Sequence, residues 1–185
     1  MLYSMAYNQK DVFFLDVSFT TSTATGDGTT QLDLSSYIDP IARKGSKAQG
    51  LAIYRVSTSV TEGNSSVPGM DLDGSMRIGL LAGLGAGDNA TGAVSFNSGA
   101  LSASNDLLVY GSDFYADTGV AMPRNYEWLT PTKDVPYIIV RDNVCLCTDI
   151  DDNFATAVTV SMRLECAVVP LDQSTLNQLL RTQTV

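Results

Sequence analysis

The sequence predicts an all-β protein, an eight-stranded antiparallel jelly-roll sandwich or barrel with long loops and a short C-terminal helix. Two observations support this prediction. About eight segments of strand-forming residues follow one another, separated by turn signals rich in Gly, Pro, Asn and Asp. Helical spacing of apolar residues is clear only near the C-terminus. Successive strands without intervening helices are typical of antiparallel sheets that pack as a sandwich or close as a barrel.

The segment 156–169 is the longest predicted strand, and the other strands are expected to form a sheet beside it. From Val158 onward every second residue is apolar, and the residues between them are Thr, Ser, Arg and Glu. This period of two indicates a strand with one buried face and one face in water. We therefore expect one row of apolar side chains in the core: Val158, Val160, Met162, Leu164, Cys166 and Val168.

The first half of the chain is predicted to contain four strands. The first, residues 11–22, has alternating apolar residues that should face inward, namely Phe13, Leu15, Val17 and Phe19. Arg77 should lie on the outer face of the fourth strand, opposite Met76 and Ile78. The other strands of this half are expected at residues 30–37, 51–61 and 76–80.

The second half is less regular. A weak strand is predicted at residues 93–97, and stronger ones at 107–110 and 135–149. Asp142 and Asn143 interrupt the last of these, either as a bulge within one strand or as the turn of a hairpin. A bulge keeps eight strands and fits a jelly roll, whereas a hairpin changes the strand order.

The C-terminal tail is predicted to form the single helix. Leu176, Leu179 and Leu180 have helical spacing, and Ser174 stands before them as the expected N-cap. With 185 residues, one domain is the simplest organisation. We divide the chain into an N-terminal arm, a jelly-roll domain and a tail, at residues 1–10, 11–171 and 172–185. No apolar run reaches the ~18 residues that a membrane-spanning helix needs, and the start does not have the pattern of a signal peptide.

The charge of the chain restricts its partners. The formal net charge is −9, and a protein this acidic repels nucleic acid because phosphate binding needs clusters of Lys and Arg. Concentrated salt screens such self-repulsion, so the composition suits a protein that works in brine. An ordinary acidic surface is the alternative. The connector 41–50 holds a local group of basic residues, interpreted as a solvated loop or, alternatively, as a contact for an acidic neighbour or anionic lipid.

No catalytic, cofactor or metal site is predicted. The chain contains no His, which removes the commonest general base and imidazole metal ligands. Gly85, Gly87 and Ala90 match a dinucleotide fingerprint in spacing, but the helix that this motif requires does not follow them. The segments starting at Asp71 and Asp149 begin like calcium loops and lack the Gly and Glu that complete such loops.

The three cysteines are interpreted as buried thiols. Cys145 and Cys147 should point to the same face of a strand, and no His is present to complete a zinc site with Cys166. Unpaired Cys behaves as a small apolar residue. A disulfide between Cys166 and one member of the pair is the alternative.

The long connection at residues 112–134 is the candidate interaction site. Loops of this length within a compact domain are often functional, and aromatic residues are enriched at protein interfaces. We expect a subunit interface formed by its aromatic side chains: Phe114, Tyr115, Tyr126 and Trp128.

In its length, its eight or so strands, its Asp-rich composition and its lack of a catalytic set, the chain resembles the small major capsid protein of membrane-containing icosahedral haloarchaeal viruses, the sphaerolipovirus group. The resemblance implies a single vertical jelly roll in the capsid of a virion. It also implies a larger single-jelly-roll partner protein, homo- and hetero-oligomers with other capsid subunits, an internal membrane beneath the shell, and no enzymatic activity.

Two alternatives come from other classes of protein. A carbohydrate-binding β-sandwich module of a halophile would use Tyr115, Tyr126 and Trp128 as stacking platforms. A glycosidase would need two carboxyl groups ~5–10 Å apart in a cleft.

Overall fold

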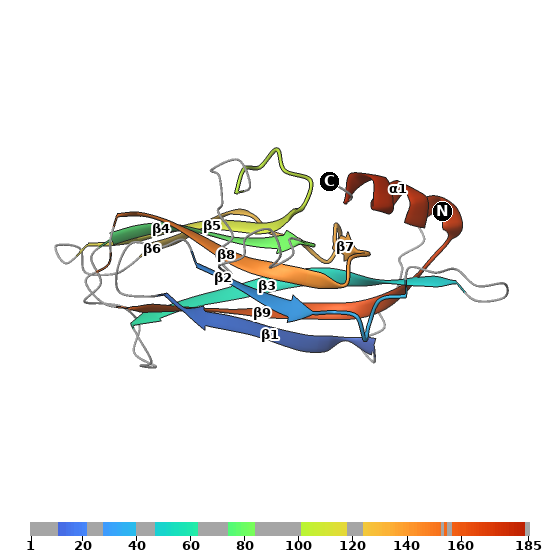
Figure 1. The fold of residues 1–185 in the computed structure, drawn as a ribbon, viewed down its shortest axis with the longest axis horizontal. Coiled ribbons are helices and arrows are strands. Elements are labelled where there is room, and N and C mark those ends of the chain that lie inside the picture. Colours follow the sequence, from blue (N-terminus) through green and yellow to red (C-terminus); the bar gives the residue numbers. More distant parts are fainter. Residues whose placement is uncertain are drawn as a thin grey trace, which may run out of the picture.

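The fold consists of two facing antiparallel sheets (Figure 1). The computed structural model describes residues 11–21, 28–39, 47–62, 74–83, 101–117, 124–152, 154 and 157–183, with the backbone alone at 62, 151 and 152. The β9 sheet contains, in order, β1 (Phe13–Thr20), β9 (Val158–Leu171), β3 (Ala48–Glu62) and β7 (Tyr137–Ile139). The β8 sheet contains β2 (Gly28–Asp33), β8 (Asn143–Asp152), β4 (Gly74–Ala82), β5 (Leu108–Ala116) and β6 (Arg124–Leu129). Helix α1 (Gln173–Thr182) follows β9.

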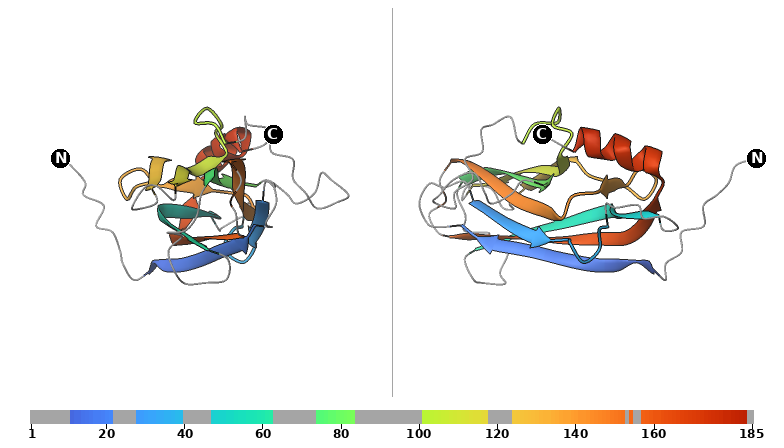
Figure 2. Two further views of the ribbon diagram at one scale, coloured as in Figure 1. Left: turned by 90° about the vertical axis from the view of Figure 1, so that its left-hand side faces the viewer. Right: turned by 45° about the vertical axis from the view of Figure 1, so that its right-hand side comes forward.

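The strand order is that of a jelly roll with one additional strand. With β6 set aside, the first strand pairs with the last, the second with the last but one, and the fourth with the fifth. This nesting of two Greek keys is the jelly-roll arrangement. The predicted all-β sandwich is therefore confirmed, with nine named strands in the described part of the chain instead of eight. Figure 2 shows the same two layers from the end and obliquely.

Strand β9 has the central role that its sequence predicts. It pairs with β1 on one side and with β3 on the other, so that Leu164 lies level with Leu15 and Val56. The predicted row from Val158 to Cys166 is buried, and Val168 is half-buried. The two inner faces together form one apolar core. A buried aliphatic side chain stabilises the fold by about 1.5–3 kcal/mol, so these rows account for much of its cohesion.

The structure replaces both interpretations of Asp142 and Asn143. Strand β7 belongs to the β9 sheet and β8 to the β8 sheet, so the chain crosses between the sheets at residues 140–142. The break is neither a bulge nor a hairpin turn. The Leu34 N–H donates to the Asp142 carbonyl over 2.6 Å and holds this crossover against the end of β2. Because the two halves of the predicted strand belong to different sheets, the jelly-roll order is kept.

The prediction of a long loop at residues 112–134 is wrong. Strand β5 continues to Ala116, and β6 forms a further strand that pairs with it. Ser112 and Asp113 resemble turn residues in sequence, but Ser112 is small enough to lie fully buried. Strand β6 is an edge strand whose first four residues are all exposed, so it has no buried face to give an apolar period.

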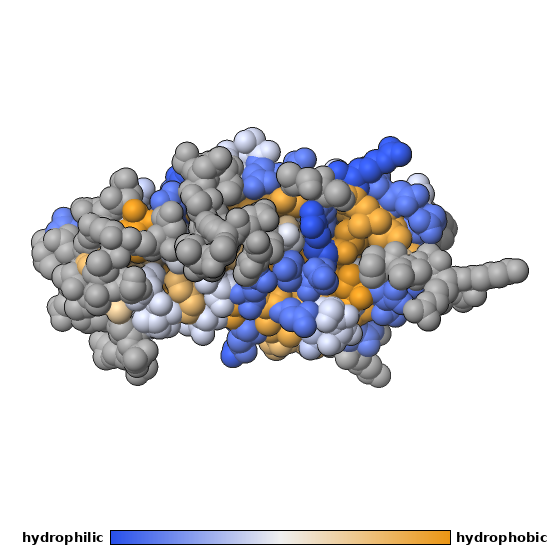
Figure 3. Space-filling model, viewed as in Figure 1, coloured by the Kyte–Doolittle hydropathy of each residue, from blue (hydrophilic) through white to orange (hydrophobic). Residues whose placement is uncertain are grey.

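The predicted helix is present, but its N-cap is different. The Asp172 carboxylate accepts a hydrogen bond from the Thr175 N–H over 2.7 Å, so the helix begins before Ser174. Leu176 is buried, and α1 packs near β7 at one end of the sandwich (Figure 1). Figure 3 shows hydrophobic surface between hydrophilic side chains toward this end.

Gln183, the residue after α1, connects the helix to the β9 sheet by hydrogen bonds. The Gln183 side chain donates to the Ile138 carbonyl over 2.6 Å and accepts from the Val140 N–H over 3.1 Å. Its amide thus bonds the outer edge of β7 as a neighbouring strand would. The Arg141 guanidinium also donates to the Gln183 carbonyl.

Several predictions fall outside the described residues: the arm 1–10, most of the connector 41–50 and the weak strand 93–97. Among the helices in the described ranges, none has the length and apolar character needed to cross a membrane.

Candidate interaction surfaces

Three of the four predicted interface residues share the outer face of the β8 sheet. Tyr126 lies opposite Asp113 in the pairing of β5 with β6, and Tyr115 is its diagonal neighbour two positions further along β5. Diagonal pairs on one face are within reach of aromatic side chains. Both tyrosines are exposed, at 54% for Tyr115 and 65% for Tyr126. We call Tyr115, Tyr126, Trp128, Arg77 and Asp113 the aromatic face.

Arg77 connects the parts of this face. Its guanidinium donates two hydrogen bonds to the Asp113 carboxylate, over 2.7 Å and 3.2 Å, and lies 5.4 Å from the centre of the Trp128 ring. The bond to Asp113 raises the pKa of Arg77 despite its partial burial. The Trp128 ring sits over Gly111, where any Cβ would lie 2.4 Å from it. The missing side chain at Gly111 therefore makes room for the indole.

The aromatic face contains a shallow hollow of about 270 Å³ beside Tyr115. Arg77, Asp113 and Asp149 line it together with Ser75. The arrangement places exposed rings next to fixed hydrogen-bond donors and acceptors. Such a surface can bind a partner that combines flat apolar and polar groups.

Phe114 does not belong to this surface, which corrects its prediction as an interface residue. It lies between Asp113 and Tyr115 on β5, so its side chain points to the opposite face of the sheet. There it is 4% exposed and packs against Phe154, with the ring centres 6.2 Å apart. Its role is in the core.

The outer face of the β9 sheet has a different character. Residues at the same level on β1, β9 and β3 form rows across this face, and two of the rows consist of one residue type each. We call this surface the hydroxyl face; its rows are Thr20–Thr159–Thr61, Ser18–Ser161–Ser59 and Asp16–Arg163–Ser57. The Thr20 and Thr159 hydroxyls lie 2.7 Å apart, and the Arg163 guanidinium donates to Asp16 over 2.7 Å.

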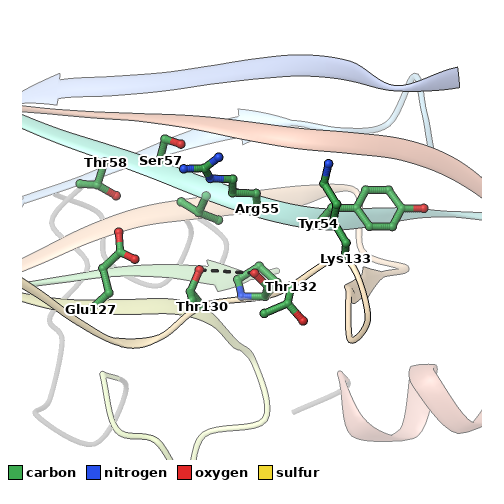
Figure 4. A pocket seen from close by; sticks show the side chains of 10 residues that line it. Tyr54, Arg55, Ser57, Thr58, Glu127, Thr130, Thr132 and Lys133 are labelled. Atoms are coloured by element: carbon green, nitrogen blue, oxygen red, sulfur yellow. Dashed lines mark hydrogen bonds between the residues drawn. The ribbon is translucent and has the colours of Figure 1, made fainter. Parts of the chain in front are cut away.

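A groove of about 470 Å³ opens between β3 and the chain from Glu127 to Lys133. Figure 4 shows Glu127 pointing toward Thr58 across this groove. The buried Tyr110 phenol donates to the Glu127 carboxylate over 3.1 Å. Burial raises the pKa of Tyr110, the Ser112 and Thr58 hydroxyls act in the opposite direction, and the Glu127 charge raises it further. The Thr58 hydroxyl nevertheless makes no hydrogen bond of good geometry within the described part of the chain.

The cysteines are free and buried, as predicted, and lie on two different faces. Cys166 belongs to the core between the sheets. Cys145 and Cys147 belong to a second apolar cluster on the outer side of the β8 sheet, with Leu101 and Leu107. The alternative disulfide with Cys166 is therefore absent.

The other candidate motifs do not form a site in the described structure. Residues 149–152 are the end of β8, where a calcium loop would need a turn. Phe154 and Val160 stand at the positions where that loop would need Gly and Glu, and both are buried. Met76, at the Gly position of the motif starting at Asp71, lies in β4. Residues 71–73 and the glycines at positions 85 and 87 lie outside the described residues. Within the described ranges, no group of three or more Cys, Asp or Glu side chains could hold a metal ion.

No protein-family model matches the chain, and no curated protein matches it in sequence. The fold and the three surfaces are thus the basis for a functional argument.

Proposed function

We propose that this protein is a structural subunit of a virion, a small major capsid protein that builds an icosahedral shell over an internal membrane with a larger single-jelly-roll partner. The observation that carries the proposal is the strand order, β1-β9-β3-β7 facing β2-β8-β4-β5. Viral capsid proteins are a major class of jelly-roll proteins. The acidic charge of −9 agrees with assembly in brine, as the sequence resemblance implies.

The aromatic face is the proposed contact with neighbouring subunits. Exposed tyrosines next to a bidentate Arg–Asp pair match the composition of interfaces, where Tyr, Trp and Arg are enriched. Truncation of Tyr126 to Ala should therefore weaken assembly more than truncation of Ser161 on the hydroxyl face.

The test is electron microscopy and light scattering of the purified protein in molar salt, alone and with the capsid partner. A regular lattice or closed particles are expected. When the salt is lowered to the millimolar range, assemblies should dissociate while the circular dichroism of the subunit persists, because like charges at the contacts are no longer screened. A protein that stays monomeric under all these conditions, with and without the partner, would contradict the proposal.

A carbohydrate-binding module is the second candidate, and one observation favours it. Tyr115 and Tyr126 are exposed neighbours beside the Arg77–Asp113 pair, which could stack on a sugar ring and bond its hydroxyls. Titration with a panel of glycans, followed by the fluorescence of Trp128, separates the two. Saturable binding that Tyr115→Ala abolishes, together with a monomeric state in molar salt, would favour the carbohydrate-binding module.

A further inference from the structure

Strand β3 extends far beyond one of its neighbours. Its full length, Ala48–Glu62, pairs with β9, whereas β7 covers only Leu51–Ile53 on the other side. In the described part of the chain, no strand pairs with this second edge from Arg55 to Glu62. The edge of a sheet presents backbone N–H and C=O groups that can pair with another chain. The segment Arg55–Glu62, called here the open edge, is therefore suited to accept a strand.

The groove between β3 and β6 lies along the same side. Arg55, Ser57 and Thr58 of the open edge line it, and Glu127 of β6 points toward Thr58 (Figure 4). The groove is lined by hydroxyl groups, by the Glu127 carboxylate and by the cationic side chains of Arg55 and Lys133, together with Tyr54, Val56 and Pro131. Such a mixed lining fits an extended polypeptide better than a wholly apolar ligand.

We propose that residues 1–10 of a second copy of this chain add to the open edge as an extra β-strand. The proposal rests on the capsid function proposed above and specifies one contact in the assembly. Ten extended residues span at most ~36 Å, which is enough to cover an edge of eight residues. The arm also has a strand-like pattern: Tyr3, Met5 and Tyr7 would point to one side, and Ser4, Ala6 and Asn8 to the other.

Charge favours the same pairing. The arm contains Lys10 and no acidic residue, so its formal charge is +1. Since the whole chain has a net charge of −9, residues 11–185 carry −10. The arm is thus attracted to the acidic body of a neighbouring copy as a whole. At the groove itself, the Glu127 carboxylate lies beside the cations Arg55 and Lys133, of which Lys133 pairs with Glu165 over 3.4 Å.

The topology favours the arm of a neighbour over the subunit's own arm. Strands β1 and β3 are both antiparallel to β9, which separates them, and Phe13 lies level with Ile53. The chain therefore enters β1 on the far side of β9 from the open edge, at the level where that edge begins. An arm from another copy can approach the open edge directly.

The test uses amide hydrogen exchange. The protein lacking residues 1–10 is mixed with a synthetic peptide of residues 1–10 in molar salt, with a scrambled peptide as control. The arm peptide should slow exchange in Arg55–Glu62 and leave β1 and β2 unchanged, because only the open edge gains backbone hydrogen bonds. Protection elsewhere, or equal protection by the scrambled peptide, would overturn the proposal.

Matched variants test the charge contribution. Glu127→Gln keeps an acceptor for the Tyr110 phenol and removes one charge, and should weaken peptide binding roughly two- to fivefold. Asp142→Asn removes the same charge at the exposed crossover and should leave binding unchanged. Equal effects of both variants would show that only the net charge matters and would contradict binding at the groove.

Concentration identifies the source of the arm. In the full-length protein, protection of Arg55–Glu62 should appear only as oligomers form; protection in a dilute monomer would assign the edge to the subunit's own arm and overturn the proposal. If the shortened protein still forms a regular lattice without such protection, this inference fails while the capsid function stands. If the peptide protects the open edge but no assembly occurs, the capsid function fails.

Discussion

The outer faces of the two sheets each carry an Arg–Asp pair beside an aromatic ring, in different surroundings. On the aromatic face, Arg77 bonds Asp113 over 2.7 Å and lies over Trp128 at 5.4 Å. On the hydroxyl face, Arg163 bonds Asp16 over 2.7 Å and lies 6.0 Å from the centre of the Phe14 ring. The two pairs differ in exposure: the Asp113 side chain is 17% exposed and that of Asp16 63%.

The difference shows that the role of an Arg–Asp pair depends on the residues around it. The Trp128 ring, for which Gly111 leaves room, shields one side of the Arg77 pair, whereas rows of Ser and Thr leave the Arg163 pair in water. A shielded pair is fixed in position and can orient a partner, while an exposed pair contributes little to stability. We therefore propose that the aromatic face is the recognition surface and regard the hydroxyl face as a solvated surface.

The largest effect is expected in the core that lies beneath the hydroxyl face. Leu164 is fully buried on the inner side of β9, so Leu164→Ala should lower the free energy of unfolding by ~2–5 kcal/mol. Ser161→Ala on the outer side of the same strand should change it by about 0.5 kcal/mol or less. Denaturant titration followed by circular dichroism measures both. Similar values for the two variants would mean that the faces of β9 are not as different as the comparison requires.

A smaller effect on stability is expected for a substitution at Gly111, which leaves room for Trp128 in the aromatic face. Gly111→Ala places a methyl group against the Trp128 ring and should cost about 1–3 kcal/mol by displacing the indole. Trp128 is the only Trp in the chain, so its fluorescence reports the displacement directly. A red shift of the emission is expected. An unchanged spectrum and stability would show that the indole does not occupy this position.

The reactivity of the three thiols tests the difference between the two sides of the β8 sheet. Cys145 and Cys147 lie under the segment that contains Leu101 and Leu107, while Cys166 lies between the sheets. A local opening of that segment exposes the first two, whereas Cys166 requires opening of the sandwich. With a thiol reagent at pH 8, Cys145 should react first, because the neighbouring Cys147 thiol lowers its pKa. Mass spectrometry of the labelled peptides gives the order of reaction, and earlier labelling of Cys166 would contradict it.

Cys166 also predicts a dependence on alkaline pH. Burial raises the pKa of its thiol to about 12, compared with 9.0 for an unperturbed thiol. Because the folded state holds this proton more tightly, the resulting stability is fully present below pH 9 and is lost as the pH rises toward 12. Cys166→Ala should make the unfolding free energy less dependent on pH in this range. An unchanged slope would mean that the thiol ionises equally easily in the folded protein.

The sequence predicted those parts of the molecule in which local pattern and packing agree. Strand β9 has one buried and one exposed row, so its period of two was sufficient to predict its inner face. Strand β6 lies at an edge with most of its residues exposed, and no period marked it. The division of residues 135–149 between two sheets depends on pairing with distant strands, which the local sequence does not record.

The candidate surfaces show the same limit. Aromatic character alone singles out Tyr115, Tyr126 and Trp128 in the sequence, and it does not distinguish Phe114 from them. Only the pairing of β5 with β4 and β6 separates Phe114 from its neighbours. The sequence contains no signal for the role of Gln183, because its side-chain amide meets the edge of β7 only in the folded structure.

The smallest effects are expected for the two ion pairs themselves. Double-mutant cycles with Arg→Gln and Asp→Asn isolate each coupling energy from the other contacts of the arginine. For Arg77 and Asp113 we expect up to about 1 kcal/mol, because Trp128 holds the guanidinium in place and Asp113 is largely shielded. For Arg163 and Asp16 the coupling should be within experimental error, since both side chains are mostly in water. Molar salt should reduce the difference. A coupling at the hydroxyl face equal to that at the aromatic face would show that shielding does not distinguish the two pairs, and the assignment of recognition to the aromatic face would lose its electrostatic support.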